Sequence, residues 1–452
     1  MLELKNIIIV GGNAAGPAAA AKAKRVLPES NVIMFEAGNF ISTGTCELPY
    51  VLSGDIKNYR DIVFYNPESF EKEKGVKVLT NHRVEKINRR QKTITVRNLL
   101  LNNVFEQNYD KLILATGSRA KLNPSLFPLP KNVFSLKSVH DLISIQDYIH
   151  SNRVRNILLI GAGYIGLEIA DAFKKCGLNV LISEKENLPM SGVDDEIRNL
   201  IAGQLKDNEV PFIGNSGELK FISENGKVIS VNILGRIIDI DMIINSIGFE
   251  PNNDLAVAAN LEIGKFGGLK VDNKLRTSDQ NIFAAGDNIE VINRITNKKE
   301  FIPIATLAQK YGHIAGENAA GGNSFVSPVV INIAVKIFDK CLVVVGISSE
   351  EAVKNRFSYS SVSAIEKNLV KVMPASESTF GKIIFEKNSY NILGAQFFGG
   401  KEVIGYGDLI ASFVQNKIKA VELENINYNY TPPLSPFINL LSVLGRKIKR
   451  EK

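Results

Sequence analysis

Cys46 is the residue of the chain with the clearest potential for chemistry. It ends a short polar loop, residues 41–46 (Ile-Ser-Thr-Gly-Thr-Cys), just before an apolar run at residues 48–52. Pro49 favours the first turn of a helix, so the sequence predicts a helix over 48–52 with Cys46 at its N-terminus. The helix N-terminus stabilises a thiolate, the nucleophilic form, and lowers the thiol pKa. Glu47 opposes this, because a carboxylate favours the neutral thiol. On the local sequence alone, a small buried residue without chemistry remains open.

The other cysteines and the histidines add no metal-binding pattern. The three cysteines are Cys46, Cys176 and Cys341, and the four histidines are His82, His140, His150 and His313. None of the spacings between them is that of a metal site. We therefore expect no bound metal, no disulfide framework and no CxxxxC redox pair. Cys176 and Cys341 fall in a predicted helix and a predicted apolar strand, and we interpret both as packing residues.

The elements that must position Cys46 begin with a βαβ unit at the N-terminus. A buried-strand run at 7–10 leads into Gly-Gly-Asn-Ala-Ala-Gly at 11–16, an Ala-rich helix at 17–26 and a strand at 31–35. Glycines at the first turn and an acid after the second strand form the dinucleotide fingerprint. Asn13 stands where the middle glycine is usual, which leaves a plain tight turn as the alternative. The predicted cofactor-binding residues are Gly11, Gly12, Ala15, Gly16 and Glu36.

A second βαβ unit follows, and its glycine pattern is complete. A strand at 156–160 precedes Gly-Ala-Gly-Tyr-Ile-Gly at 161–166, and a later strand at 179–182 ends close to Glu184. Two such units predict two dinucleotides. Glu184 would bind an adenosine 2′-hydroxyl and repel a 2′-phosphate, which favours NADH, although Lys185 leaves NADPH open. The predicted cofactor-binding residues here are Gly161, Gly163, Ile165, Gly166, Glu184 and Gly248.

Two further buried strands are predicted to return the chain to the first unit. One ends in Ala-Thr-Gly at 115–117, and the other ends in Ala-Gly-Asp at 285–287, before a helix that starts near 301 and continues to about 320. Asp287 is expected to face a ribityl or pyrophosphate group. The cofactor-binding residues added by this interpretation are Thr116, Gly117, Gly286, Asp287 and Ala305.

The predicted fold class is α/β, with two Rossmann-like nucleotide-binding domains and a C-terminal α+β domain. A length of 452 residues suits two or three domains. We place the first nucleotide-binding domain at 1–149 and 256–324, the second at 150–255, and the C-terminal domain at 325–452. The strands predicted in the last domain are 329–337, 341–345, 369–372, 381–386 and 392–398, followed by a helix at 403–417.

Composition excludes several classes of protein. Hydrophobic residues make up 45% of the chain and charged residues 22%, and no apolar run is long enough to span a bilayer. The N-terminus lacks the layout of a signal peptide, so we expect a cytoplasmic protein. The net charge of +7 is dispersed, which favours phosphate-bearing ligands or solubility over nucleic-acid binding.

Taken together, these motifs resemble the flavin-dependent pyridine nucleotide-disulfide oxidoreductases over nearly the whole chain. The sequences around Ser42 and Cys46, Leu-Pro-Tyr at 48–50 and Tyr-Thr-Pro-Pro at 430–433 resemble the single-cysteine branch, which includes coenzyme A disulfide reductases, persulfide reductases and NADH oxidases and peroxidases. The resemblance implies FAD on the first domain, NADH or NADPH on the second, and a C-terminal domain that forms a homodimer. It also implies that Cys46 and the partner-facing Tyr430 are catalytic.

Several residues differ from those usual in the single-cysteine branch, and these differences bear on which sulfur substrate is bound. Oxidases and peroxidases of this type carry a histidine at the position of Ala14. The coenzyme A disulfide reductases carry an alanine there, as this chain does. The residues that differ from those reductases are Thr45 for Asn, Glu47 for Gly, His313 for Arg, and the region 372–374 where a second tyrosine is lost. The resemblance implies that Ser42, Lys22 and Arg25 bind substrate, with Lys22, Lys24 and Arg25 near coenzyme A phosphates. A solvated helix face is the alternative for the basic residues.

Three functions follow from these expectations. The first is an enzyme that passes electrons from NAD(P)H through FAD to a small-molecule disulfide or persulfide by way of Cys46. The second is an NADH oxidase or peroxidase with a cysteine sulfenic acid. The third is a flavoprotein that relays electrons to a protein partner or senses redox state, which Glu47 and the altered cysteine loop motivate.

Overall fold

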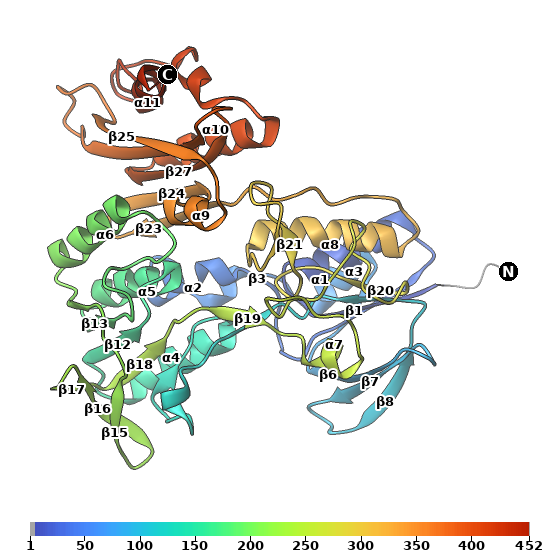
Figure 1. The fold of residues 1–452 in the computed structure, drawn as a ribbon. Coiled ribbons are helices and arrows are strands. Elements are labelled where there is room, and N and C mark those ends of the chain that lie inside the picture. Colours follow the sequence, from blue (N-terminus) through green and yellow to red (C-terminus); the bar gives the residue numbers. More distant parts are fainter. Residues whose placement is uncertain (1–4, 452) are drawn as a thin grey trace.

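The computed structural model describes residues 5–451. Figure 1 shows three regions: the blue and yellow segments lie together on one side, the green segments on the other, and the orange and red segments above the green ones. This arrangement confirms the α/β class with two Rossmann-like sheets. The third region, built from the C-terminal part of the chain, is an α+β unit.

The first sheet is parallel and almost completely buried. Its strands, in spatial order, are β20 (Ile282–Ala284), β9 (Lys111–Leu114), β1 (Asn6–Val10), β2 (Asn31–Phe35) and β5 (Lys77–Leu79). Ile8 has no exposed surface and lies between Ile33 and Leu112 in register. β20 pairs with β9, which confirms the predicted return of the chain to the first unit.

Two helices pack face to face beside this sheet, α1 (Ala15–Val26) and α8 (Ala305–Ala319) (Figure 1). Their approach depends on two glycines of α8. A Cβ atom on Gly312 would collide with the main-chain oxygen of Ala15, and one on Gly316 with that of Ala19. Because glycine has no side chain, the two helix backbones touch.

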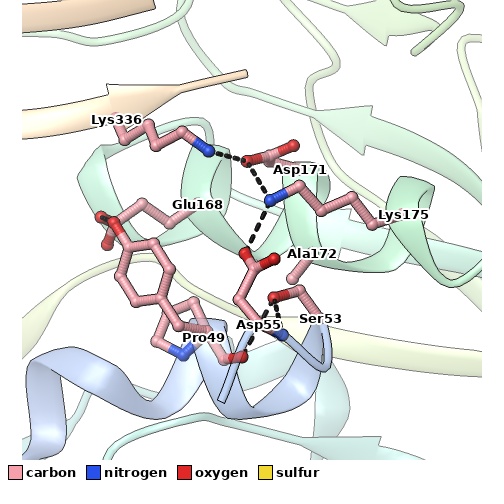
Figure 2. Close-up of a pocket in the computed structure, with 9 residues that line it drawn as sticks. Pro49, Ser53, Asp55, Glu168, Asp171, Ala172, Lys175 and Lys336 are labelled. Atoms are coloured by element: carbon pink, nitrogen blue, oxygen red, sulfur yellow. Dashed lines mark hydrogen bonds and ion pairs between the residues drawn. The ribbon is translucent and has the colours of Figure 1, made fainter. Parts of the chain in front are cut away.

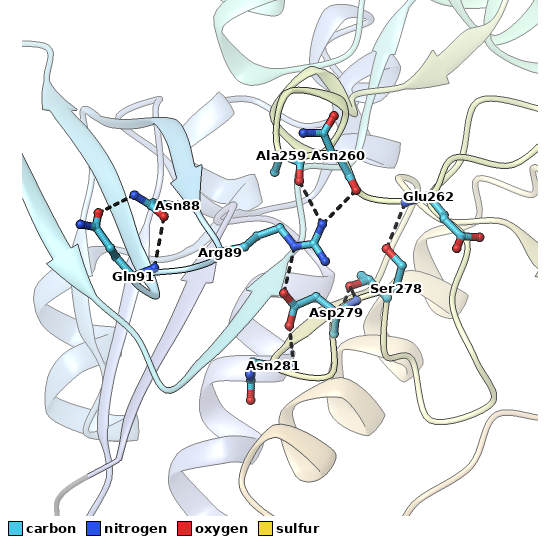
Figure 3. Close-up of polar contacts among 10 residues, drawn as sticks. Asn88, Arg89, Gln91, Ala259, Asn260, Glu262, Ser278, Asp279 and Asn281 are labelled. Atoms are coloured by element: carbon cyan, nitrogen blue, oxygen red, sulfur yellow. Dashed lines mark hydrogen bonds and ion pairs between the residues drawn. The ribbon is translucent and has the colours of Figure 1, made fainter.

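An antiparallel meander extends from the first sheet: β6 (His82–Asn88), β7 (Thr93–Asn98) and β8 (Val104–Asn108). Figure 3 shows Arg89, in the turn between β6 and β7, reaching toward Asn260 and Asp279. The Arg89 guanidinium donates to Asp279 at 3.0 Å and to the main-chain oxygen of Asn260 at 3.0 Å. These contacts tie together segments that lie far apart in sequence, near α7 (Asp254–Ala258).

The second sheet repeats the parallel arrangement. Its order is β11 (Val133–Phe134), β18 (Met242–Asn245), β12 (Asn156–Ile160), β13 (Asn179–Ser183) and β14 (Phe212–Ile213). The main helices of this region are α4 (Val139–Ser151), α5 (Tyr164–Lys175) and α6 (Asp195–Asp207). A three-stranded antiparallel sheet projects from it, made of β15 (Lys220–Glu224), β16 (Lys227–Ile233) and β17 (Arg236–Asp239).

Short elements join the two nucleotide-binding regions. β10 (Ser118–Ala120) pairs with β19 (Phe249–Pro251) where the chain crosses between them. β3 (Ile41–Thr43) pairs with β4 (Val63–Tyr65), and between these strands lie η1 (Thr45–Glu47), α2 (Leu48–Leu52) and η2 (Tyr59–Ile62). The remaining short elements are α3 (Pro67–Lys74), η3 (Pro124–Leu126), β21 (Val291–Ile292) and β22 (Lys299–Glu300).

The C-terminal region is one antiparallel sheet with helices. The order is β23 (Asn332–Ile337), β24 (Lys340–Gly346), β27 (Ile392–Gly399), β26 (Ser378–Glu386) and β25 (Tyr359–Lys367). The helices are α9 (Ser349–Lys354), α10 (Val403–Asn416), η4 (Ala420–Glu424) and α11 (Leu440–Arg450). The predicted strand at 369–372 is wrong: those residues form a bend and turn after β25, the strand that the sequence analysis missed.

Other predicted boundaries shift slightly. The helix expected from about 301 begins at Ala305, because Ile304, the residue before it, has an extended backbone. The strand expected from 329 begins at Asn332. Within residues 5–451 no helix is long and apolar enough to cross a membrane.

Candidate functional site

Cys46 lies in the 3-10 turn η1, immediately before α2, and its side chain is exposed. The predicted helix over 48–52 is confirmed, with Pro49 at its start. The loop is held in place from one side by the β3–β4 pairing and from the other by Asn13. The Asn13 Oδ1 atom accepts hydrogen bonds from both the main-chain N–H and the hydroxyl of Thr43, each at 2.9 Å.

The pKa of the Cys46 thiol is raised, so the expected lowering by the helix N-terminus is wrong. Although Cys46 keeps exposed surface, the protein atoms around it desolvate the thiolate, which is the largest cause, and the carboxylates of Glu47 and Glu168 add to it. Lys137 acts in the opposite direction without reversing the shift. The dipole of a five-residue helix is weaker than these effects.

The first glycine loop forms a close cradle. Gly11 has φ +114°, a backbone conformation that L side chains rarely adopt, and a Cβ atom there would collide with the main-chain oxygen of Ala115. A Cβ atom on Gly16 would collide with the oxygen of Gly11. Glu36 closes the cradle, because its carboxylate accepts from the N–H of Gly12 at 2.6 Å.

Two of the residues predicted around this cradle, Thr116 and Gly286, lie beside it. The hydroxyl of Thr116 donates to the main-chain oxygen of Asn252 at 2.7 Å, and Gly117 has φ +66°. A Cβ atom on Gly286 (φ +100°) would lie 3.1 Å from the Ala15 methyl. Ala305 is the first residue of α8.

Asp287 belongs to a polar group that sequence analysis missed in part. Its carboxylate accepts from the Ser118 hydroxyl at 2.9 Å and pairs with Lys137 at 3.3 Å. The Lys137 ammonium also lies 4.4 Å from the centroid of the Phe249 ring. No local sequence signal marks Lys137, since 150 residues separate it from Asp287.

The second glycine loop repeats the geometry of the first. Gly161 has φ +103°, and a Cβ atom there would lie 2.7 Å from the main-chain oxygen of Ser246. Gly163 caps α5, which contains Ile165 and Gly166, and a Cβ atom on Gly166 would collide with the oxygen of Gly161. The Glu184 carboxylate accepts from the N–H of Ala162 at 2.8 Å. Gly248 has φ +107° and lies away from the loop in sequence.

A polar cluster lies where the three regions meet, beside α2 (Figure 2). Lys175 pairs with Asp55 at 2.7 Å and with Asp171 at 3.7 Å, and Lys336 of β23 pairs with Asp171 at 3.5 Å. The Tyr50 hydroxyl donates to the Glu168 carboxylate at 3.2 Å. Burial raises the pKa of Glu168 to about 7.

Sequence analysis quoted Tyr50 as part of a motif without giving it a role, and it did not single out Glu168. Glu168 lies two residues after the last glycine of its loop, on a helix whose neighbouring residues Leu167 and Ile169 are buried. A carboxylate among such residues is a usable signal for a perturbed group. Its partner could not be predicted, because Tyr50 lies 118 residues away.

Two of the basic residues of α1 already have partners within the chain. Lys22 pairs with Glu317 of α8 at 2.8 Å, and Lys24 donates to the main-chain oxygen of Ser30 at 2.8 Å. Arg25 lies in the last turn of α1. Nearby, burial and the charges of Arg25 and Lys22 lower the pKa of His313.

Tyr430, which the resemblance implied to be catalytic, is far from Cys46 in sequence and lies on the surface. It is 48% exposed, and its ring packs edge-on against Phe437 with centroids 5.2 Å apart. Leu434 and Phe437 are each 76% exposed. These side chains form an apolar patch that we call the 430s patch: Tyr430, Leu434, Phe437 and Ile438.

The other cysteines differ from expectation in one case. Cys176 is exposed at the C-terminal end of α5 and donates its S–H to the main-chain oxygen of Leu52, so its interpretation as a packing residue is wrong. Cys341 lies in β24 and is partly buried. All three cysteines are free, and no group of three potential metal ligands occurs in residues 5–451.

The residues present fit two dinucleotide cofactors. In both glycine loops the main chain packs so closely that a Cβ atom would collide with it, and each loop leads into a helix N-terminus, where N–H groups bind phosphate. Two buried oxygen atoms beside the first cradle have no hydrogen-bond partner among the described residues, namely Ser42 Oγ and Asn288 Oδ1. Ser42 also has φ +50°. These features suit a bound polar ligand that supplies the missing donors.

Comparisons with known proteins agree with this geometry. The family model described as "Pyridine nucleotide-disulphide oxidoreductase" matches residues 5–310. An NADH oxidase from Methanocaldococcus jannaschii is 31% identical over 95% of each chain. A coenzyme A disulfide reductase from Staphylococcus aureus is 29% identical over 99% of this chain and all of that protein.

Among solved structures, an NAD-dependent persulfide reductase from A. fulgidus superimposes with a TM-score of 0.94 at 29% identity. The superposition covers 99% of this chain and 83% of that one.

Proposed function

Because the chain belongs to the pyridine nucleotide-disulphide oxidoreductase family, we propose that it is an FAD-dependent enzyme that passes electrons from NAD(P)H to a disulfide or persulfide through Cys46. FAD is characteristic of the family. The observation that carries the proposal is the hydrogen-bonded link from the first glycine loop to the cysteine loop, through Asn13 and Thr43. This link supports a position of the exposed Cys46 thiol beside the cradle that suits the flavin.

The reaction requires few groups of the protein. When bound, FAD accepts a hydride from NAD(P)H and delivers two electrons to sulfur. The Cys46 thiolate attacks the substrate S–S bond, a bond from Cys46 to one sulfur forms, and the other sulfur leaves as a thiolate. The net change is one disulfide and NAD(P)H plus a proton giving two thiols and NAD(P)⁺. Gly11, Gly16 and Glu36 would hold the flavin nucleotide, and Gly161, Gly166 and Glu184 the nicotinamide nucleotide.

We propose NADH as the preferred donor. Glu184 ends the second strand of its unit, where it would accept from a ribose 2′-hydroxyl and repel a 2′-phosphate. The other assigned cofactor residues are Gly12, Ala15, Thr116, Gly117, Gly163, Ile165, Gly248, Gly286, Asp287 and Ala305.

The sulfur substrate is small. Relatives with similar sequences include a coenzyme A disulfide reductase and a persulfide reductase. Lys22 and Arg25 of α1 would meet phosphate groups, but the ion pair of Lys22 with Glu317 weakens that end of a coenzyme A site. Ser42 would contact the substrate beside Cys46. Ala14 offers no proton donor for peroxide chemistry, which argues against the oxidase alternative.

We propose that the enzyme is a homodimer in which the 430s patch is covered by a second copy. Leu434 and Phe437 are exposed close to Tyr430 in the chain, and grouped exposed apolar side chains are typical of a contact surface; in this interpretation Tyr430 reaches the partner's thiol site. We divide the chain into domains at 1–149 with 256–324, at 150–255 and at 325–452. Three unpaired cysteines suit a reducing compartment, so we propose a cytoplasmic location.

Anaerobic reduction tests the function. NADH should bleach the bound flavin, and a disulfide or persulfide should restore its colour with one equivalent of acceptor consumed for each NADH. Cys46→Ser should still be bleached by NADH but should lose turnover with sulfur acceptors. Equal turnover by Cys46→Ser would overturn the role of the cysteine.

A further inference from the structure

The side chain of Glu47 is folded against the cysteine loop. Glu47 follows Cys46 in η1, and its main-chain N–H donates to the oxygen of Gly44 at 3.2 Å. The carboxylate returns over the same glycine: a Cβ atom on Gly44 would lie 2.5 Å from Glu47 Oε2 and 2.7 Å from Glu47 Cδ. Only a glycine at position 44 leaves room for this conformation. In this conformation the negative charge lies over the cysteine loop, close enough to act on the Cys46 thiol.

No described residue neutralises this carboxylate. Within residues 5–451, Glu47 makes no ion pair and its carboxylate accepts no hydrogen bond. It is half-buried, so its field reaches the loop through a medium less polar than bulk water.

The other charges around the thiol do not compensate. Glu168 and Asp287 are the further acidic groups that act on Cys46, and Lys137 is the basic one. Lys137 is already engaged, since it pairs with Asp287 at 3.3 Å and lies over the Phe249 ring. The surroundings of the sulfur are therefore negative, and Glu47 is the member without a partner.

We propose that Glu47 determines which sulfur substrates the site accepts: Cys46 reacts faster with disulfides that are neutral or cationic beside the sulfur than with anionic ones. The inference rests on the proposed function and names the substrate class. In the exchange step the Cys46–S bond forms as the substrate S–S bond breaks, so charges next to that bond come within a few ångström of Glu47. Two unit charges about 6 Å apart at an effective dielectric constant of about 40 change a rate by about tenfold.

Three disulfides of similar size test the proposal: cystamine (a dication), bis(2-hydroxyethyl) disulfide (neutral) and 3,3′-dithiodipropionate (a dianion). Their kcat/KM values are compared for the flavin-loaded wild type, Glu47→Gln and Glu47→Lys at low ionic strength. We expect the wild type to prefer the dication, and the ratio of dication to dianion to fall about a hundredfold in Glu47→Gln, because each charged substrate changes about tenfold relative to the neutral one and in opposite directions. The preference should reverse in Glu47→Lys. The ratio is independent of the thiolate fraction, because all three substrates meet the same thiol.

Glu106→Gln is the matched control. Glu106 is exposed on β8, in another sheet, and its removal changes the net charge by the same amount. The ratio should stay at the wild-type value in this variant. Added salt should reduce the preference of the wild type, because it screens the carboxylate.

A ratio that is the same in the wild type and in Glu47→Gln overturns the inference. That variant is nearly isosteric, so it decides the question even where Glu47→Lys loses its flavin. The same ratio is also measured without NADH, from the rate at which each disulfide adds to Cys46 in mass spectra. Absence of any disulfide turnover in the wild type would overturn the proposed function, while these adduct rates would still decide the role of Glu47.

Discussion

The two βαβ units of this chain share their local geometry and differ in what surrounds them. In each, the first glycine has a positive φ, +114° at Gly11 and +103° at Gly161. In each, the acid after the second strand accepts from the second loop residue, at 2.6 Å from Glu36 to Gly12 and at 2.8 Å from Glu184 to Ala162. The sequence motif thus fixes one backbone arrangement twice.

The neighbours of the two helices are different. α1 lies against α8, with backbone contact at Gly312 and Gly316, and its loop is joined to the cysteine loop. α5 lies beside α2 and β23 and contributes Glu168, Asp171 and Lys175 to the polar cluster. The first unit is therefore packed closely and linked to the cysteine loop, which suits the proposed flavin site beside the thiol. The second unit presents titratable groups to the junction of all three regions.

Adding one methyl group to each first glycine should separate the two roles. Gly11→Ala places a side chain in a strained conformation and against the oxygen of Ala115, at a cost of about 3 kcal/mol or more. We expect the purified variant to contain little FAD. Gly161→Ala meets the oxygen of Ser246 and should keep its FAD while KM for NADH rises by about tenfold or more.

The flavin-to-protein ratio and the NADH dependence of flavin bleaching measure these effects. Wild-type FAD content in Gly11→Ala, or FAD loss in Gly161→Ala with unchanged KM for NADH, would contradict the assignment of the two loops.

The contact between α1 and α8 is a second feature that distinguishes the first βαβ unit from the second. Gly312→Ala forces the two helices apart and should lower the free energy of unfolding by about 2 kcal/mol, seen as a lower Tm of the holoenzyme. Gly405→Ala is the matched control, because Gly405 lies on α10 with open space around it. That variant should be neutral or slightly stabilised, since alanine favours a helix over glycine. An equal loss in both variants would show that the contact has no special weight.

Sequence was sufficient for the features that depend on neighbours in the chain. The glycine loops, Glu36, Glu184 and the helix after Cys46 follow from spacing and periodicity. The contacts of Glu168 with Tyr50 and of Lys137 with Asp287 join residues 118 and 150 positions apart, so no local pattern marks them. The raised pKa of Cys46 has this origin in part, because burial and Glu168 are tertiary effects, whereas the contribution of Glu47 is local and was expected from the sequence.

The errors in the C-terminal region arose because local strand propensity was misleading there. Residues 369–372 (Leu-Val-Lys-Val) have high strand propensity but form a turn. The strand that was missed, β25, alternates serine with apolar residues and pairs along its whole length with β26. Cross-strand packing decided the outcome there, and single-strand propensity did not.

The acids at the ends of the second strands should affect different cofactors. Glu184→Ser removes the charge expected to repel a 2′-phosphate, so the ratio of kcat/KM for NADPH to that for NADH should rise by about tenfold. Glu36→Ser should lower FAD content and leave this ratio unchanged. Steady-state rates with both nucleotides give the ratio. An equal shift of this ratio in both variants would mean that the ratio reflects general damage to the protein and not recognition of the 2′-phosphate.

The smallest expected effect concerns Glu168, the titratable group that distinguishes α5 from α1. Its pKa is raised to about 7 by burial, so the folded protein keeps a proton that the unfolded chain releases above pH 4.5 or so. The wild type therefore loses stability as the pH rises from about 4.5 to 7, and Glu168→Gln does not share that loss. The Tm of the variant relative to the wild type should rise across this window by the equivalent of about 1 kcal/mol, after allowance for solvent screening.

Tyr50→Phe is the informative control for this prediction. The hydrogen bond from Tyr50 lowers the pKa of Glu168 against the effect of burial. Removal of this hydrogen bond should extend the loss of stability to a higher pH. The double variant Tyr50→Phe with Glu168→Gln should lose the pH dependence of stability that Glu168 causes. Tm values of the holoenzymes from pH 5 to pH 8 test both. A constant difference in Tm between the wild type and Glu168→Gln would place the titrating group elsewhere, and α5 would then resemble α1 in supporting a nucleotide and nothing more.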